Sequence, residues 1–222
     1  RGVHNSQRSS HKQLQRSGHT HRIMFARFFG HYNKEKLIAF FGKQGHGKTT
    51  IVNKTCRTRH PTSGGINSCT PHAVMVPIPD LPQHYVFDTP GTEVAEDVET
   101  HVAGQAVALE HPLNLIVFVV KATRLGELRR AIGEFQDAIG MDDVGLIITH
   151  CEGWSLQERK ANLSQICGDQ DISEHKALTV DMKTKRETIL EFILGAMDKR
   201  PRDWRLSDDQ MLKFAAISQA TR

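Results

Sequence analysis

The sequence predicts an α/β fold in which a mostly parallel β-sheet is covered by helices on both faces. Apolar runs at residues 37–41, 113–120 and 144–150 lack the alternation of a half-exposed strand, and helical patterns separate them along the chain. Such strands are typical of parallel sheets that are buried on both faces. At 222 residues the chain is long enough for one domain of this kind and short for two.

The predicted elements follow one another in a regular order. The strand at 37–41 leads through a glycine-rich turn into a helix from Lys48 to about Cys56. The strand candidates at 73–78 and 84–87 are close enough to pair as an antiparallel hairpin. The remaining elements are a helix with apolar residues four apart over 94–106, a strand at 113–120, a helix at about 125–139, strands at 144–150 and 177–180, and a helix that opens with the capping box Thr184–Glu187.

Composition divides the chain into three parts. Residues 1–36 form a basic tail and lead-in, which we expect to be disordered because they have little apolar surface to offset the entropy of ordering. The predicted domain spans residues 37–200. Residues 201–222 form a short helical extension that opens with a second capping box, Ser207–Gln210.

Charge, hydropathy and cysteine content exclude several classes of function. Five of the 29 basic residues and none of the 25 acidic residues lie in residues 1–22, so the rest of the chain is near neutral despite the net charge of +4. A near-neutral domain lacks the basic surface that nucleic-acid binding requires, so we expect no nucleic-acid partner. No apolar run is long enough to cross a membrane. Four cysteines without a C-x-x-C pair favour a reducing compartment over a disulfide or zinc scaffold.

We therefore expect a cytoplasmic protein. Association with the cytosolic face of a membrane would need segments outside this chain, because the apolar runs within it are short. The sequence does not identify the process or the protein partners.

The strongest functional motif lies between the first strand and the first helix. Residues 42–49 read GKQGHGKT and fit G-x-x-x-x-G-K-[ST], a loop whose glycines let the backbone wrap a phosphate at a helix N-terminus. We expect Lys48 to reach the β- and γ-phosphates of a nucleotide and Thr49 to place its hydroxyl on Mg²⁺. The candidate phosphate-binding residues are Gly42, Lys43, Gln44, Gly45, His46, Gly47, Lys48, Thr49 and Thr50.

Two further segments are placed to complete a site for Mg²⁺ and a triphosphate. Asp88 follows the strand at 84–87, where it can hold the Mg²⁺ shell through water, and Gly91 can present its backbone N–H to a γ-phosphate. Thr70 lies in the loop before the hairpin, from which its hydroxyl can complete the Mg²⁺ shell and sense the γ-phosphate. The alternatives are an ordinary turn that begins with Asp88 and a plain loop threonine.

A candidate base-reading segment, THCE at 149–152, follows the strand at 144–150, at an edge where ligands bind in parallel sheets. Guanine offers two adjacent donors, N1–H and the N2 amine, which one carboxylate accepts, whereas adenine offers no such pair. We expect Glu152 to accept both, with His150 against the face of the base. The match to the usual Asn/Thr-Lys-x-Asp is partial, so a plain strand end, and an ATPase or kinase, remain alternatives. Asp181 is expected to cap a helix rather than to lie near the base.

The order of these motifs resembles the septin-like GTPases of the immunity-associated group (GIMAP or AIG family) and, more distantly, the Toc GTPases of chloroplast import. The segments that carry the resemblance are GKQGHGKTT, the Thr70 loop, FDTPG, LIVFVVKATR with Arg124 at its end, and IITHCE, with RLSDDQMLK resembling the start of a helical extension. The resemblance covers about residues 37–200. It implies a three-layer Ras-like P-loop G domain that binds GTP or GDP with Mg²⁺ and pairs across its nucleotide face.

The expected function is a guanine-nucleotide switch with slow GTP hydrolysis that homodimerisation or homo-oligomerisation stimulates. Thr92 stands immediately after D-x-x-G, where a Ras-type enzyme has a water-orienting glutamine. By the resemblance, Arg124 is placed to act across a dimer on the transferred phosphoryl group, and the alternative is a solvated arginine that starts a helix. A nucleotide-dependent scaffold with negligible turnover remains a second alternative. The candidate catalytic residues are Lys48, Thr70 and Arg124, and the candidate metal-binding residues are Thr49, Thr70 and Asp88.

Overall fold

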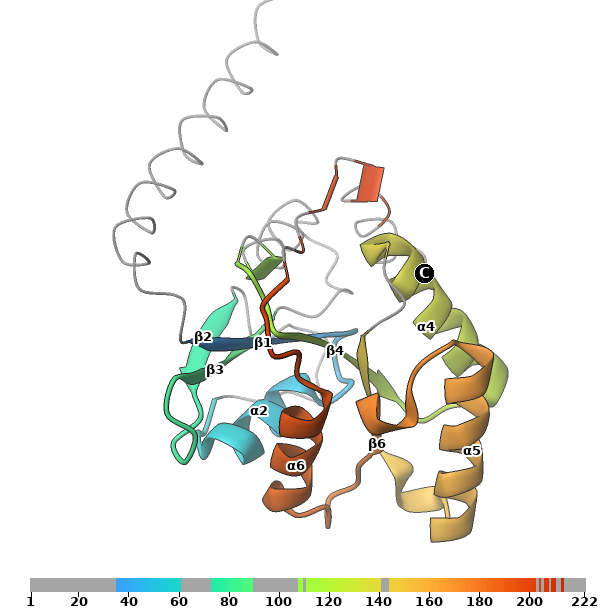
Figure 1. The fold of residues 1–222 in the computed structure, drawn as a ribbon. Coiled ribbons are helices and arrows are strands. Elements are labelled where there is room, and N and C mark those ends of the chain that lie inside the picture. Colours follow the sequence, from blue (N-terminus) through green and yellow to red (C-terminus); the bar gives the residue numbers. More distant parts are fainter. Residues whose placement is uncertain are drawn as a thin grey trace, which may run out of the picture. The chain divides into compact units, whose positions relative to one another are not determined.

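A six-stranded sheet with the order β2-β3-β1-β4-β5-β6 forms the centre of the domain in the computed structural model (Figure 1). Strand β2 pairs antiparallel with β3, and the other four pairs are parallel, as the sequence predicts. The structure describes residues 35–60, 73–89, 108–109, 111–140, 144–202, 204, 206–207, 209–210 and 213. The strands are β1 (Lys36–Phe41), β2 (Val74–Pro77), β3 (His84–Asp88), β4 (Leu115–Lys121), β5 (Gly145–Thr149) and β6 (Ala177–Thr179).

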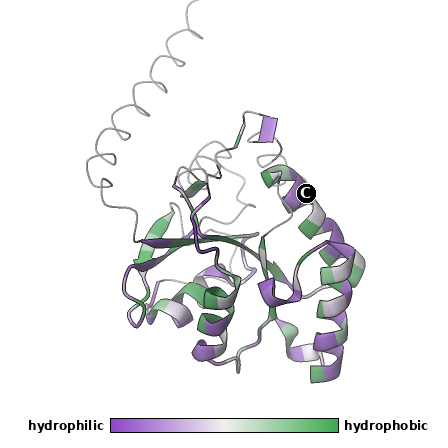
Figure 2. Ribbon diagram, viewed as in Figure 1, coloured by the Kyte–Doolittle hydropathy of each residue, from purple (hydrophilic) through white to green (hydrophobic). Residues whose placement is uncertain are grey.

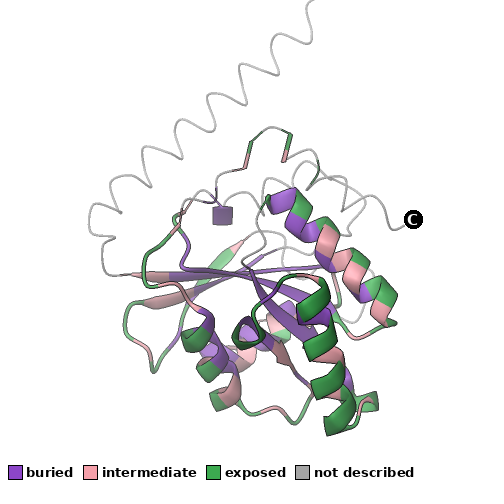
Figure 3. Cartoon of the chain, turned by 45° about the vertical axis from the view of Figure 1, so that its right-hand side comes forward, coloured by how far each residue is buried: buried purple, intermediate pink, exposed green. Residues whose placement is uncertain are grey.

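The central strands are buried on both faces. Every residue of β5 and the first six residues of β4 are buried. Within β1, Ala39 lies beside Phe87 of β3 on one side and Ile116 of β4 on the other. Figure 3 shows that burial is concentrated in the sheet, whereas the outer sides of the helices are exposed. The unbroken apolar runs of the sequence therefore reflect a sheet that is covered on both sides.

Helices cover the two faces of the sheet (Figure 1). On one face, α2 (Lys48–Cys56) and α6 (Arg186–Ala196) share an apolar cluster with alternate residues of β1 and β4, such as Phe40 and Val117. On the other face, Phe135 of α4 (Leu125–Ile139) stacks on Phe118 of β4, with ring centroids 4.2 Å apart. Hydrophilic and hydrophobic residues alternate around α4 (Figure 2), as expected for a helix with one buried side.

Helix α5 (Leu156–Asp169) packs beside α4 and has no counterpart among the predicted elements. Its core contribution is small, because Ile166 and Cys167 are its buried residues, and its apolar periodicity is correspondingly weak. The sequence signal for this helix is its capping box. Ser155 Oγ accepts a hydrogen bond from Glu158 N, and the Glu158 carboxylate accepts one from Ser155 N at 2.7 Å.

The capping box predicted at Thr184–Glu187 is wrong. Helix α6 begins at Arg186, one residue after an N-cap lysine whose side chain makes no capping hydrogen bond. The Thr184 hydroxyl instead donates to Asp181 Oδ1 at 2.9 Å. Because this loop contact already uses the hydroxyl, Thr184 orders the turn that follows β6 rather than the helix that comes after it.

The chain after α6 packs against the start of β4. Trp204 is 1% exposed and donates its Nε1–H to the carbonyl oxygen of Leu113 at 3.1 Å. Arg202 and Leu113 exchange two backbone hydrogen bonds. The second predicted capping box does form, since Ser207 and Gln210 exchange side-chain to backbone hydrogen bonds. The predicted division of the chain at residue 200 stays a prediction.

Several predicted features lie outside the described residues. These are the tail up to residue 34, the helix at 94–106, residues 211–212 and 214–222 of the helical extension, and the residues Thr70, Gly91 and Thr92. Within the part of the chain that the structure describes, no helix combines the length and the apolar character needed to span a membrane.

Replacing Trp204 by Ala should lower the free energy of unfolding by roughly 3–5 kcal/mol, because a fully buried indole and its hydrogen bond are lost. Urea unfolding followed by circular dichroism measures this change. Leu194→Ala, at a position that is 46% exposed on α6, serves as the control and should change stability by about 0.5 kcal/mol or less. A Trp204 variant as stable as the control would mean that this segment does not pack on the domain.

Candidate functional site

The candidate residues lie where the parallel strands β1, β3 and β5 end. Strand β1 leads into the loop at 42–47, β3 ends at Asp88, and β5 ends at Thr149. In the sheet, β1 lies between β3 and β4. The strands β2 and β3 extend the sheet on one side of β1, and the strands β4, β5 and β6 extend it on the other side. Such a reversal of strand order opens a crevice at the carboxyl edge, where ligands bind in open parallel sheets.

Backbone geometry explains the glycines at both ends of the loop at 42–47. Gly42 has a φ of 142°, and a Cβ at this position would collide with the carbonyl oxygen of Val119. Gly47 is the N-cap of α2 and has a φ of 90°. The first turn of α2 holds Lys48 and two threonines and no carboxylate, so no acidic side chain in this turn offsets the positive end of the helix dipole.

Lys48 lies inside this loop. The side chain belongs to a residue that is 5% exposed, and its Nζ donates to the carbonyl oxygens of Gly42 at 2.7 Å and Lys43 at 3.0 Å. Burial of an ammonium group is costly unless hydrogen bonds or an opposite charge compensate it. The loop thus holds a positive charge at the start of a helix, which favours a negatively charged ligand.

The other predicted residues of the loop are spread along its length. Lys43, Gln44 and His46 are half-buried, whereas Gly45 is exposed with a φ of 74°. Thr50 is exposed in the first turn of α2. The structure therefore places this predicted set along one continuous segment, from the end of β1 to the first turn of α2.

Asp88 and Thr49 form the candidate metal side of the site. Asp88 is 2% exposed and lies beside Phe40 of β1, and Thr49 lies in the first turn of α2. The next residue, Thr89, donates its hydroxyl to the Phe40 carbonyl oxygen at 2.6 Å, which anchors the chain beyond β3 next to β1. A carboxylate and a hydroxyl are oxygen ligands of the kind that Mg²⁺ prefers, so these donors fit the expected metal.

Thr149 connects β5 to the loop at 42–47. Its hydroxyl donates to the His46 carbonyl oxygen at 2.8 Å and lies 2.8 Å from Nδ1 of His150. His150 comes close to the loop, since a Cβ built on Gly47 would lie 3.8 Å from its ring. No separate role is predicted for Thr149 from the sequence, although a hydroxyl at the end of a buried strand is a signal that could have indicated one.

His46 brings no positive charge to the loop near neutral pH. Burial, and then the neighbouring Lys48 ammonium, lower the pKa of His46 to about 4. The imidazole is therefore neutral where the loop would hold phosphates, and Lys48 supplies the buried charge.

Glu152 links the loop that follows β5 to the loop that follows β6. Its Oε1 accepts a hydrogen bond from the backbone N–H of Met182 at 3.2 Å, and both residues are exposed. A second link joins the loops, because Cys151 N donates to the Val180 carbonyl oxygen. The structure thus places the predicted base-reading carboxylate at the same edge of the sheet as the loop at 42–47.

Asp181 does not cap a helix, contrary to the prediction. Its Oδ2 pairs with the guanidinium of Arg159 at 2.8 Å, and its Oδ1 accepts from Lys183 N and from the Thr184 hydroxyl. These contacts, the Arg159 hydrogen bond foremost, lower the pKa of Asp181 to about 2. The carboxylate is therefore ionised near neutral pH. Asp181 directly precedes Met182, whose backbone N–H donates a hydrogen bond to Glu152.

Arg124 is the N-cap of α4 and is exposed. Its carbonyl oxygen accepts the first backbone hydrogen bonds of the helix, from Glu127 and Leu128. The position agrees with an arginine that starts a helix, and an exposed guanidinium can also reach another molecule. Its catalytic role stays a prediction.

Together the fold and the glycine-rich loop define a nucleotide-binding protein of the P-loop class. Residues 37–151 match the family described as 50S ribosome-binding GTPase, and the chain belongs to this GTPase family. No curated protein matches the chain significantly.

Solved structures share the fold, which is that of a Ras-like G domain. Era in complex with MgGDPNP and nucleotides 1506–1542 of 16S ribosomal RNA has a TM-score of 0.58 at 18% identity over 75% of this chain. An Era variant from Aquifex aeolicus with GDP and AlF4⁻ has a TM-score of 0.56 at 18% identity over 76% of this chain. An NFeoB variant from S. thermophilus with GMPPNP has a TM-score of 0.57 at 13% identity over 78% of this chain.

This chain covers 58%, 59% and 64% of those three proteins, respectively. The predicted ligands, GTP or GDP with Mg²⁺, are those of GTPase G domains and agree with the nucleotides in these structures.

Replacing Asp181 by Asn should destabilise the protein near neutral pH by about 1–3 kcal/mol, because a charge-assisted contact with Arg159 is weakened. The folded-state pKa lies below the ordinary value of 3.8, so the ionised carboxylate contributes stability above about pH 4 and loses it as the pH falls through 2. The difference between the two proteins in urea unfolding should therefore shrink over this range. A difference that is independent of pH down to about 2 would contradict this assignment.

Proposed function

We propose that this protein is a guanine-nucleotide switch that hydrolyses GTP slowly when monomeric. The observation that carries the proposal is the buried Lys48 ammonium, which lies inside a loop with a glycine at each end. Asp88 and Glu152 lie at the same edge of the sheet. Membership of the GTPase family supports the class of ligand and reaction. The proposal adds a preference for guanine, a slow basal rate and activation by self-association.

The phosphates would bind through the loop at 42–47 and α2. Backbone N–H groups at the start of α2 would donate hydrogen bonds to phosphate oxygens. Lys48 would give up its hydrogen bonds to the carbonyl oxygens of Gly42 and Lys43 and contact the β- and γ-phosphates instead. Thr49 and Asp88 are the described residues that would hold Mg²⁺, with Thr70 as the proposed addition. When bound, the metal neutralises charge that develops on the phosphate oxygens.

Guanine would be selected at the loops after β5 and β6. The exposed Glu152 carboxylate can accept from N1–H and the N2 amine, and the nearby Met182 amide can donate to O6. Adenine presents an acceptor at N1 and an amine at position 6, so it would leave the carboxylate and the amide facing groups of the wrong kind. His150, which lies close to the loop at 42–47, would cover one face of the base.

Slow turnover follows from the residue at position 92. Thr92 is too short to orient water as the glutamine of a Ras-type enzyme does. We therefore propose that a second copy of the chain completes the site with Arg124, as the resemblance to the immunity-associated septin-like GTPases implies. The exposure of Arg124 at the start of α4 supports this role.

A nucleotide-dependent scaffold with negligible hydrolysis is the second candidate function. Position 92 also favours this candidate, because a site without a water-orienting residue can hold GTP for long periods. The two candidates differ in whether the rate of hydrolysis depends on protein concentration.

Lys48→Ala should weaken binding of GDP and of a non-hydrolysable GTP analogue by about a hundredfold or more, because the phosphates lose a buried positive partner. Titration with fluorescent nucleotides in the presence of Mg²⁺ measures the change. Lys160→Ala, at an exposed position on α5, is the control and should bind as the unmodified protein does. Equal affinity in the two variants would mean that the loop does not bind the phosphates.

The same titrations, repeated with ATP analogues, measure the selectivity for guanine over adenine. Glu152→Ala should reduce the preference for guanine by about tenfold or more, because the two donors of the base lose a charged acceptor. An unmodified protein that binds ATP as well as GTP would instead favour the ATPase alternative.

Single-turnover GTP hydrolysis should become faster as protein concentration rises, and Arg124→Ala should abolish this acceleration. An arginine supplied in trans can raise the rate by about a thousandfold, so even partial dimerisation should be measurable. Arg130→Ala is the matched control, since Arg130 is exposed on the same helix. A flat and negligible rate in the unmodified protein would support the scaffold, and equal acceleration in both variants would remove Arg124 from the mechanism.

A further inference from the structure

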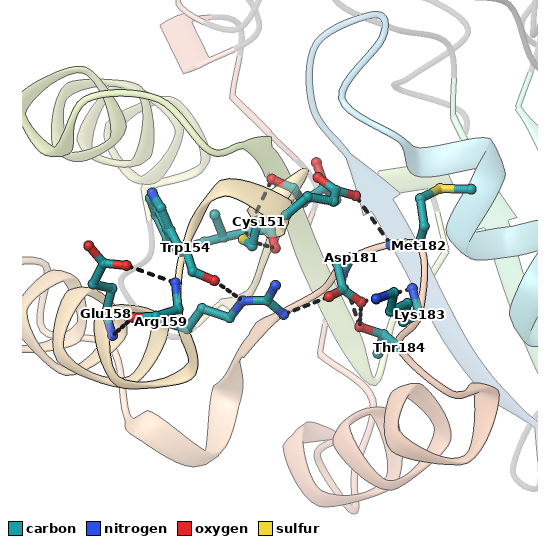
Figure 4. A network of polar contacts seen from close by, with 12 residues as sticks. Cys151, Trp154, Glu158, Arg159, Asp181, Met182, Lys183 and Thr184 are labelled. Atoms are coloured by element: carbon teal, nitrogen blue, oxygen red, sulfur yellow. Dashed lines mark hydrogen bonds and ion pairs between the residues drawn. The ribbon is translucent and has the colours of Figure 1, made fainter.

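Arg159 connects the two loops that are proposed to read the base. It extends from α5, and its Nε donates to the Trp154 carbonyl oxygen at 3.1 Å, in the loop after β5. Its other end, Nη1, lies 2.8 Å from Oδ2 of Asp181, in the loop after β6. The side chain is 16% exposed, so these contacts are largely shielded from solvent. Figure 4 shows the guanidinium between the two segments.

Asp181 transmits this contact to the backbone of its loop. Its Oδ1 accepts from Lys183 N, and the Thr184 hydroxyl both donates to Oδ1 and accepts from Asp181 N. Met182 lies between Asp181 and Lys183 in the chain, and its backbone N–H donates a hydrogen bond to the Glu152 carboxylate. The Met182 side chain is 77% exposed, so apolar packing contributes little to the position of this amide. Its placement therefore depends on polar contacts, which are those of Asp181 and the hydrogen bond that Lys54 Nζ donates to the Met182 carbonyl oxygen at 3.3 Å.

The charge of Arg159 matters as much as its reach. The Arg159 guanidinium forms an ion pair with the Asp181 carboxylate, and its hydrogen bond to that carboxylate is the foremost cause that lowers the pKa of Asp181. A guanidinium has N–H donors that point in different directions, so it can donate to the Trp154 carbonyl oxygen and to the Asp181 carboxylate at the same time. A lysine ammonium is a point charge and would satisfy one of these partners at a time.

We propose that Arg159 is a positioning residue for purine selection, which holds the Met182 amide and the Glu152 carboxylate at a fixed spacing so that they contact guanine as one unit. This inference rests on the proposed function, because it assumes that Glu152 and the Met182 amide face the base. Arg159 itself does not touch the nucleotide. Its effect should therefore fall on the base and leave the phosphate contacts of Lys48 intact.

The test compares binding of fluorescent GDP and ADP to the full chain and to its variants. Arg159→Ala should weaken GDP binding by about tenfold or more while ADP binding changes by about twofold or less, so that the guanine preference falls. Arg159→Lys should retain part of the preference. Arg129→Ala is the matched control, since Arg129 pairs with Asp169 at 2.7 Å between α4 and α5, and it should keep the preference.

A double-mutant cycle with Glu152→Ala identifies the route of the effect. When Glu152 is absent, Arg159→Ala should cost little further guanine preference, because both substitutions remove the same contact. Thermal unfolding monitors the fold of each variant, and if Arg159→Ala does not fold, the lysine variant decides the question in the same assay.

The possible failures are distinguishable. If the unmodified protein does not prefer guanine, the proposed function fails and this inference fails with it. If the unmodified protein prefers guanine and Glu152→Ala loses that preference while Arg159→Ala keeps it, the inference alone is overturned. An equal loss of GDP and ADP binding in Arg159→Ala, or full additivity in the cycle, would also overturn it, because Arg159 would then act on the domain as a whole.

Discussion

Burial of both faces of the parallel strands β1, β4 and β5 governs how the other elements of the domain are arranged. Parallel neighbours cannot be joined by tight turns, so the chain crosses over through helices, and these helices supply the apolar cover of each face. The same connectivity brings the carboxyl ends of the strands to one edge. Residues that are far apart in the sequence, such as Lys48, Asp88 and Glu152, therefore lie at the same edge of the sheet.

Hydrogen bonds between these strand ends give the edge its shape. The hydroxyl of Thr89 holds the end of β3 against β1, and the hydroxyl of Thr149 holds the loop at 42–47 against β5. Lys48 closes the loop from within through two carbonyl oxygens. These bonds hold the loop in one conformation, and a loop that is held in its binding conformation loses less entropy when a phosphate binds.

The base side of the site is held in a different way. Helix α5 buries few side chains, so its placement beside the loops depends on polar contacts: its capping box, the Arg129–Asp169 pair and the bridge from Arg159 to Asp181. The phosphate side instead rests on strands in the centre of the core. Phosphate binding and base selection can therefore respond separately to substitution, and single residues such as Arg159 carry more of the geometry on the base side.

The amino-acid sequence predicts the features that depend on local pattern: the buried strands, α2 and α4, the hairpin, and the phosphate loop with its lysine, because spacing within a few residues encodes them. It also contained the capping box of α5, although weak apolar periodicity hid that helix. The contacts between distant groups depend instead on the packing of the whole domain. The bonds from Thr89 to Phe40 and from Thr149 to His46 span 49 and 103 positions, and the Arg159–Asp181 pair joins two loops. No local pattern specifies such contacts, because strand order and helix packing bring their partners together.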